Sequence, residues 1–215
     1  MSSTIIKNIK TIYGIQTQPH PFKKGAAMSV IDTLEHAYIL IEGDIIQSFG
    51  PMSDAPDRAD LEIDATDSLV LPTWCDSHTH IVYAQGREGE YVDRLKGISY
   101  EEIARNGGGI LNSAARLRTK SEDELYLSAK KRLDEVIQNG TGAIEIKSGY
   151  GLTLDSEMKM LKVIRRLKET SSATIKSTFL GAHAIPLEYK ENRDAYIQLL
   201  VNEMIPQVAG EGLAD

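Results

Sequence analysis

Two histidines separated by one residue, His78 and His80, have the type and spacing best suited to chemistry in this sequence. Residues i and i+2 of a strand point to the same face, so two imidazoles there can share one metal ion, and imidazole suits zinc or iron(II). Asp76 would lie on that face too and support the ligands. Random placement of the five histidines gives such a pair in about one sequence in ten. The pair nevertheless ends an apolar strand, where an unliganded imidazole is costly, and this position favours a metal site.

Three more polar side chains follow predicted strands. Arg87 lies in the loop after the histidine strand and could bind a carboxylate through its planar guanidinium, although a lone arginine is more often a solvated surface residue. Tyr150 stands between two glycines after a strand at 143–147, where an ordinary glycine turn is an equally good interpretation. His183 ends a strand at 174–180. Ligands of parallel α/β folds bind at the carboxyl ends of strands, so the three positions favour one shared site.

The elements that must position these residues change in type near Pro72. Before it, residues 37–41, 45–49 and 61–63 have the pattern of short strands. After it, strands alternate with helices, which is typical of parallel βαβ units and predicts an α/β fold. Further strands are expected at 69–71, just before Pro72, and at 143–147 and 174–180. Helices are expected at 100–104, from the glycines 107–109 through Leu117, between the capping-box residue Ser121 and Gly140, around 161–167, and at 193–204.

Composition narrows the function classes. The 24 basic and 31 acidic residues give a net charge of −7, which argues against a nucleic-acid partner. No apolar run approaches the ~20 residues that span a bilayer, so we expect no membrane partner either. The single cysteine, Cys75, excludes an intrachain disulfide and is typical of a cytoplasmic protein. A small-molecule substrate remains the expected partner.

Ten residues around the histidine pair, Leu71-Pro72-Thr73-Trp74-Cys75-Asp76-Ser77-His78-Thr79-His80, resemble the first-strand signature of the amidohydrolase superfamily. Within that superfamily, four more segments resemble the imidazolonepropionase family: Gly86–Glu88, Asn106–Ile110, Glu145–Leu152 and Thr178–Ala184. The last two are specific to the family, and the resemblance covers nearly the whole chain. Where many relatives have glycine and small aliphatic residues, this sequence has Thr73-Trp74-Cys75, a departure that concerns packing more than chemistry.

The resemblance implies a metal-dependent (β/α)8 barrel and a β-sandwich domain. Residues 1–71 would form the N-terminal part of a composite sandwich, and residues 72–215 the first half of the barrel. It also implies the hydrolysis of 4-imidazolone-5-propanoate to N-formimidoyl-L-glutamate by a water molecule that one zinc or iron ion activates. The implied metal ligands are His78 and His80, and the implied substrate contacts are Arg87, Tyr100, Tyr150 and His183.

The family pattern also requires a third histidine ligand and a late aspartate, which this sequence lacks after His183. We therefore expect these groups and the general base beyond Asp215, and we interpret the chain as the N-terminal half of the enzyme, inactive and poorly soluble by itself. A full barrel uses ~250 residues. Two alternatives stay open: another cyclic amidohydrolase or deaminase of the superfamily, and an inactive fragment that keeps the site residues. A homodimer at full length also stays open.

Overall fold

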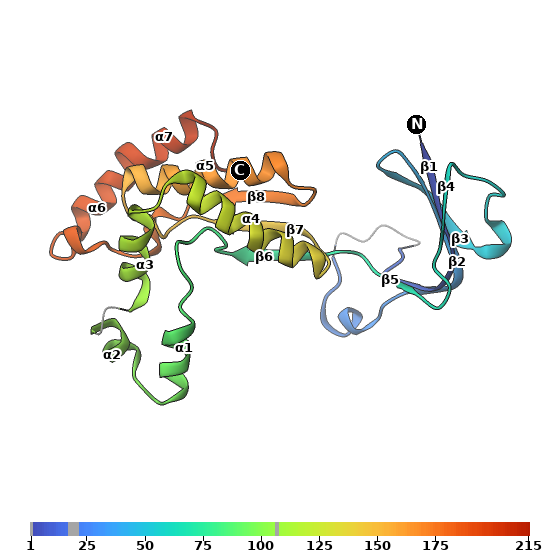
Figure 1. The fold of residues 1–215 in the computed structure, drawn as a ribbon, viewed down its shortest axis with the longest axis horizontal. Coiled ribbons are helices and arrows are strands. Elements are labelled where there is room, and N and C mark those ends of the chain that lie inside the picture. Colours follow the sequence, from blue (N-terminus) through green and yellow to red (C-terminus); the bar gives the residue numbers. More distant parts are fainter. Residues whose placement is uncertain (1, 17–21, 106–107) are drawn as a thin grey trace. The chain divides into compact units, whose positions relative to one another are not determined.

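The structure, a computed structural model, describes residues 2–16, 22–105 and 108–215 (Figure 1). The chain divides into two compact units, Met1–Pro72 and Thr73–Asp215. Asn106 and Gly107, which belong to the glycine-rich segment noted in the sequence, lie outside the described residues.

The first unit is built on a five-stranded sheet in which β1 is central. The long β1 pairs antiparallel with β2 on one side and parallel with β4 and β5 on the other, and β3 forms a hairpin with β2. The strands are β1 (Ser3–Tyr13), β2 (Thr33–Glu42), β3 (Ile45–Pro51), β4 (Leu61–Asp64) and β5 (Leu69–Val70). The strands expected at 37–41, 45–49 and 61–63 are confirmed, whereas β1 was not expected. A small apolar cluster that includes Ile9, Ile12 and Ile39 is its core.

The second unit is an α/β unit with a parallel sheet in the order β6-β7-β8, with bounds Trp74–Thr79, Thr141–Lys147 and Thr174–Thr178. Its helices are α1 (Glu88–Leu95), α2 (Tyr100–Arg105), α3 (Gly109–Arg118), α4 (Glu122–Gln138), α5 (Leu154–Thr170), α6 (Arg193–Leu199) and α7 (Ile205–Gly210). Short 3-10 turns lie at Gly25–Ser29 and Met52–Asp54 in the first unit and at Gly181–His183 and Leu187–Tyr189 in the second. Throughout residues 2–16, 22–105 and 108–215, every helix is too short or too polar to cross a membrane.

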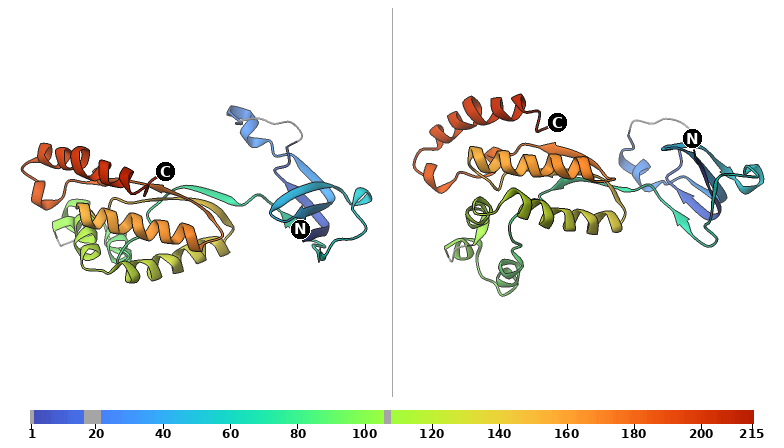
Figure 2. Two further views of the ribbon diagram at one scale, coloured as in Figure 1. Left: turned by 90° about the horizontal axis from the view of Figure 1, so that it is seen from above. Right: turned by 45° about the horizontal axis from the view of Figure 1, so that its top comes forward.

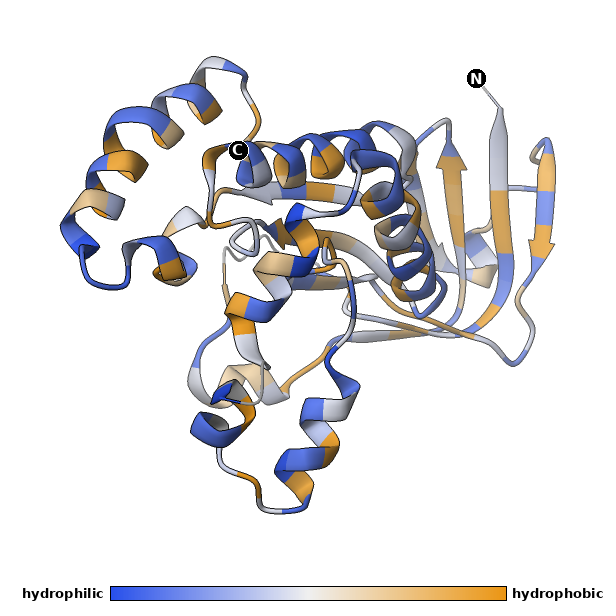
Figure 3. Cartoon of the chain, turned by 60° about the vertical axis from the view of Figure 1, so that its left-hand side comes forward, coloured by the Kyte–Doolittle hydropathy of each residue, from blue (hydrophilic) through white to orange (hydrophobic). Residues whose placement is uncertain are grey.

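Two long helices cover one face of this sheet. α4 and α5 lie side by side (Figure 2), α4 against β7 and α5 against β8. Ile144, Ile146 and Ile175 of the strands are buried in one cluster with Leu133 of α4 and Leu161 of α5. Hydrophobic and hydrophilic residues alternate along these helices, as the colours in Figure 3 show, so each has an apolar side available for the sheet.

Alternate residues of the strands are polar and face away from this core. Glu145 and Lys147 of β7 form an ion pair and are partly exposed, and Thr178 of β8 donates a hydrogen bond to the same Glu145 carboxylate. Lys176 of β8 is exposed. The sheet therefore has one apolar, covered face and one polar face, as the period of two along a strand requires.

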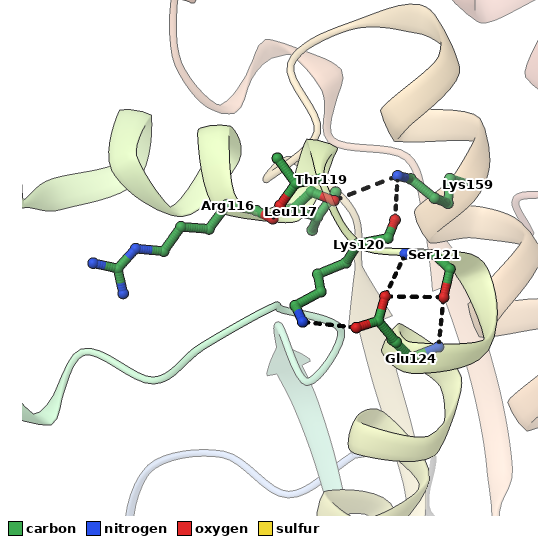
Figure 4. A network of polar contacts seen from close by, with 7 residues as sticks. All are labelled: Arg116, Leu117, Thr119, Lys120, Ser121, Glu124 and Lys159. Carbon is green, nitrogen blue, oxygen red and sulfur yellow. Dashed lines mark hydrogen bonds and ion pairs between the residues drawn. The ribbon is translucent and has the colours of Figure 1, made fainter.

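The first turn of α4 is fixed by the expected capping box. The Ser121 hydroxyl accepts a hydrogen bond from the Glu124 backbone N–H at 3.2 Å, and the Glu124 carboxylate accepts one from the Ser121 N–H at 2.9 Å (Figure 4). Lys159 of α5 donates to the carbonyl of Lys120 at 2.7 Å and to that of Arg118 at 3.2 Å. The connection between α3 and α4 is thereby tied to α5.

Two expected elements differ from their sequence pattern. β8 stops at Thr178 and not at residue 180, because the Leu180 N–H donates to the Ser148 hydroxyl at 3.0 Å and not to a neighbouring strand. The helix expected at 193–204 is α6 followed by a π turn at Leu200–Met204. Pro206, just beyond that turn, has no N–H and in a regular α-helix would collide with the carbonyl four residues earlier, which accounts for the widened turn.

Candidate active site

The end of β6 carries the histidine pair. The ring centroids of His78 and His80 are 5.8 Å apart, in an edge-to-face arrangement. β6 is irregular here, because Asp76 pairs with Ile144 whereas Thr79 pairs with Ile146, so one strand spans an extra residue. The Asp76 carboxylate accepts a hydrogen bond from the His78 backbone N–H at 3.1 Å. The strict alternation assumed for residues 76, 78 and 80 is therefore interrupted, although the two rings still lie near one another.

The ring of His80 meets two further aromatic rings, which come from two other strand ends. The ring centroid of His80, after β6, lies 4.9 Å from that of His183 and 5.0 Å from that of Tyr150. The rings of Tyr150 and His183 are 5.5 Å apart. Tyr150 follows β7, and His183 lies in the 3-10 turn after β8. The carboxyl ends of the parallel strands thus bring together residues that are more than a hundred positions apart in the chain.

The surroundings of the His80 ring are those of a buried imidazole without a hydrogen-bond partner in the described part of the chain. Both ring nitrogens are buried, and neither has a hydrogen-bond partner in the described part of the chain. Burial first, and then positive charge at His183, His78 and Lys147, together lower the pKa of His80 to about 4. The ring is therefore neutral at pH 7 and has a free lone pair. Two unsatisfied imidazole nitrogens in a buried place fit metal ligation, because a metal ion would satisfy the nitrogen that faces it.

The described residues hold no complete metal centre. Over residues 2–16, 22–105 and 108–215, no group of three or more His, Cys, Asp or Glu side chains gathers in a way that could hold an ion. Catalytic zinc ordinarily has three protein ligands. The site as described can therefore supply the histidine pair and no third ligand.

A cleft of about 310 Å³ extends from His80 and Tyr150 to Arg87. Arg87 is the N-cap residue of α1, and its Nε lies 3.7 Å from the Glu90 carboxylate. The Arg87 side chain is 40% exposed, so its guanidinium is open to a bound anion. The structure thus places three of the residues singled out in the sequence along one cleft. Tyr100 begins α2, and its side chain lies outside the described part of the chain.

Several residues of this cleft were missed in the sequence. Tyr83, Gln85 and Ser113 line it, from the segment after β6 and from α3. Arg132 of α4 donates hydrogen bonds to the carbonyls of Ile81 at 2.9 Å and Tyr83 at 3.2 Å, and its guanidinium lies 3.5 Å from the centre of the Tyr83 ring. No sequence motif identifies these residues, because the role of each depends on contacts between segments that are distant in the sequence.

The turn that holds His183 is supported from below by α6. The buried Tyr196 hydroxyl donates a hydrogen bond to the Gly181 carbonyl at 2.6 Å. Burial raises the pKa of Tyr196, so the hydroxyl remains protonated and donates at all ordinary pH values. Burial lowers the pKa of His183, against the opposing effect of the Glu157 charge. Both histidines of the ring cluster are thus disposed to be neutral.

Several known enzymes have sequences similar to that of this chain. An imidazolonepropionase from Flavobacterium psychrophilum is 54% identical to this chain over 213 residues, which are 99% of the chain and 52% of that protein. The chain is similar to imidazolonepropionases over nearly its whole length. Another imidazolonepropionase, from Christiangramia forsetii, is 54% identical over 98% of this chain and 52% of its own length. One from Pseudomonas aeruginosa is 46% identical over 89% of the chain and 47% of its own length.

The chain therefore spans about half the length of the curated imidazolonepropionases it matches. No protein-family model matches it. Among solved structures, a triazine hydrolase from Arthrobacter aurescens superposes with a TM-score of 0.52 at 16% identity, over 94% of this chain and 51% of that chain. This likeness concerns the fold alone, and it agrees with the α/β fold expected from the sequence.

Proposed function

We propose that this chain is the N-terminal half of an enzyme that hydrolyses 4-imidazolone-5-propanoate to N-formimidoyl-L-glutamate, a step of histidine degradation. One structural observation carries the proposal. The rings of His80, Tyr150 and His183 meet at three neighbouring strand ends, and the cleft beside them reaches Arg87. The similarity to imidazolonepropionases over 99% of the chain supports the same substrate.

The cleft matches the parts of this substrate. Arg87 binds the propanoate carboxylate, because its guanidinium is open and its one ion pair, with Glu90, is long at 3.7 Å. Tyr150 and His183 orient the imidazolone ring and stabilise charge that develops on its carbonyl oxygen. Tyr100 would be a further substrate contact. Hydrolysis adds one water molecule across a ring C–N bond, which opens the cyclic amide.

His78 and His80 would hold one zinc or iron ion, and the unpartnered nitrogens of His80 support this role. When bound, the ion supplies a water molecule of lowered pKa and polarises the ring carbonyl. The neutral state of His80 at pH 7 leaves its lone pair available for that bond. The proposal assigns the remaining ligands and the general base to the part of the imidazolonepropionases that this chain does not cover.

The same proposal covers the two units. The parallel strands β6, β7 and β8, with helices between them, would be the first half of a (β/α)8 barrel, whose interior is the polar face that carries Glu145 and Lys147. The sheet of residues 1–72 would be part of a composite β-sandwich. The substrate is a small molecule, and a homodimer is the assembly we propose for the full-length enzyme.

The test is turnover by the protein at its full natural length, purified with zinc or iron(II). We expect formation of N-formimidoyl-L-glutamate, its loss in His80→Ala together with the bound metal, and a raised KM in Arg87→Met. Arg94→Met, at an exposed position of α1, is the matched control and should leave KM unchanged. Turnover of other cyclic amides with no turnover of 4-imidazolone-5-propanoate would contradict the proposal.

A further inference from the structure

The loop that carries Tyr150 is bound from within by one buried carboxylate. Glu157, in the first turn of α5, has no exposed surface. Its Oε2 accepts a hydrogen bond from the Gly149 backbone N–H at 2.9 Å, and its Oε1 accepts two, from Gly151 and Leu152, each at 2.8 Å. All three donors belong to the four residues 149–152, so one side chain is hydrogen-bonded to the backbone on both sides of Tyr150.

The loop needs such a contact because its backbone is strained at Leu152. Leu152 has φ of +56° and Gly149 has φ of +107°. Both values lie in regions that residues other than glycine rarely adopt. Leu152 is fully buried, so its N–H has no water to bind and depends on the carboxylate. Hydrogen bonds to an ionised acceptor are about twice as strong as neutral ones, and here they hold the strained turn closed.

The same loop also lies directly against His183. A Cβ on Gly149 would come within 2.9 Å of the His183 Cβ and 2.8 Å of the Leu180 carbonyl oxygen. From outside, Arg118 Nε donates to the Gly151 carbonyl at 3.3 Å. The position of residues 149–152 therefore sets the separation of the Tyr150 and His183 rings, which is 5.5 Å.

We propose that Glu157 is a positioning residue of the active site, which sets the place of Tyr150 against His183 through the three loop amides. This inference rests on the proposed function, because it assigns Tyr150 and His183 to the substrate. An apolar side chain would fill the same space under α5 but would leave three buried donors unpaired. The carboxylate serves the loop and not the helix alone, since each of its bonds goes to a residue before α5.

The first test measures the loop itself by amide hydrogen exchange on the protein at its full natural length. In Glu157→Gln, an NH2 group replaces one of the two acceptor oxygens, and exchange should rise at least tenfold at the amides that lose their acceptor. These are Gly149 when the NH2 group takes the place of Oε2, and Gly151 and Leu152 when it takes the place of Oε1, while Ile144 and Ile146 in β7 stay unchanged. Glu169→Gln, an exposed position on the same helix, is the control. If Glu157→Gln does not fold, Glu157→Asp, which keeps the charge but is one methylene shorter, serves the same comparison. Unchanged exchange at the three amides would overturn the proposal.

The second test measures catalysis by the protein at its full natural length, with 4-imidazolone-5-propanoate as substrate. A displacement of about 1 Å can cost about a hundredfold in rate, so kcat/KM should fall by about that factor in Glu157→Gln and not in Glu169→Gln. If Glu157 acts through Tyr150, the substitution has little further effect in a Tyr150→Ala background. Full additivity of the two effects would overturn the positioning role. Absence of turnover in the unsubstituted protein would contradict the proposed function instead, and the exchange experiment would still decide the role of Glu157 in the loop.

Discussion

The segments that carry Tyr150 and Arg87 follow neighbouring strands and line one cleft, yet they are held very differently. Residues 149–152 are hydrogen-bonded to the buried Glu157 of α5, and α5 has eight buried residues. α1, which begins after Arg87, has no buried residue, and its N-cap makes no side-chain hydrogen bond. The Arg87–Glu90 contact that joins its first turn is long and exposed.

The difference indicates how the two ends of the cleft work. The end proposed to hold the imidazolone ring is preorganised, because its hydrogen bonds exist before any ligand arrives. The end proposed to hold the carboxylate depends on the Arg87 side chain, which is 40% exposed. We therefore expect the substrate carboxylate to order Arg87 and α1, whereas residues 149–152 should be the same with and without substrate.

The largest effect should come from the same substitution made under each segment. Leu161 of α5 is fully buried whereas Leu95 of α1 is 72% exposed. Leu161→Ala should lower the free energy of unfolding of the second unit by about 2–5 kcal/mol, because it leaves a cavity in the core. Leu95→Ala should change it by less than about 0.5 kcal/mol. Urea unfolding measures both, and equal losses would show that α1 is packed as firmly as α5.

A smaller and opposite pair of effects should follow from adding one methyl group. Gly149→Ala introduces a Cβ 2.8 Å from the Leu180 carbonyl oxygen at a φ of +107°, so it should destabilise the unit by about 1–3 kcal/mol. Gly89 in α1 has nothing within 4 Å of such a Cβ. Gly89→Ala should stabilise α1 by up to about 1 kcal/mol through helix propensity. Thermal unfolding of the two variants would contradict this account if both shifted in the same direction.

The smallest effect on stability should come from the capping box of α4. α1 has no such cap, because its N-cap residue makes no side-chain hydrogen bond. Hydrogen bonds from Lys120 and Ser121 lower the pKa of Glu124 from 4.5 to about 2. Because the folded value is the lower one, the capping box stabilises the unit fully above pH 4.5, and this contribution is lost as the pH falls toward 2. In Glu124→Gln the stability should therefore depend less on pH between 4.5 and 2. Urea titrations at pH 5 and pH 3 measure this, and an unchanged slope would contradict it.

The sequence predicted the elements whose signals are local. Ser121, Glu124 and Gly140 bounded α4, and the carboxyl-end rule placed Tyr150 and His183 beside the histidine pair. It did not predict α1, because Gly86–Glu90 has the composition of a loop and the helix has no cap signal. Nor did it predict the irregular pairing of β6, which depends on β7.

The supports of the site could not be found in the sequence for a related reason. An acidic residue in the first turn of a helix is ordinary, since it favours the helix dipole, and Glu157 looks like any other. Its burial and its three bonds depend on how the loop returns over α5. Arg132 likewise has its role only once Tyr83 lies beneath its guanidinium.

The contrast between the two segments is tested most directly by amide hydrogen exchange of the unsubstituted chain without ligand. The account predicts that the amides of Gly149, Gly151 and Leu152 exchange at least a hundredfold more slowly than those of the exposed helix α1. Equal protection of the two segments would contradict the claim that one end of the cleft is preorganised and the other is not.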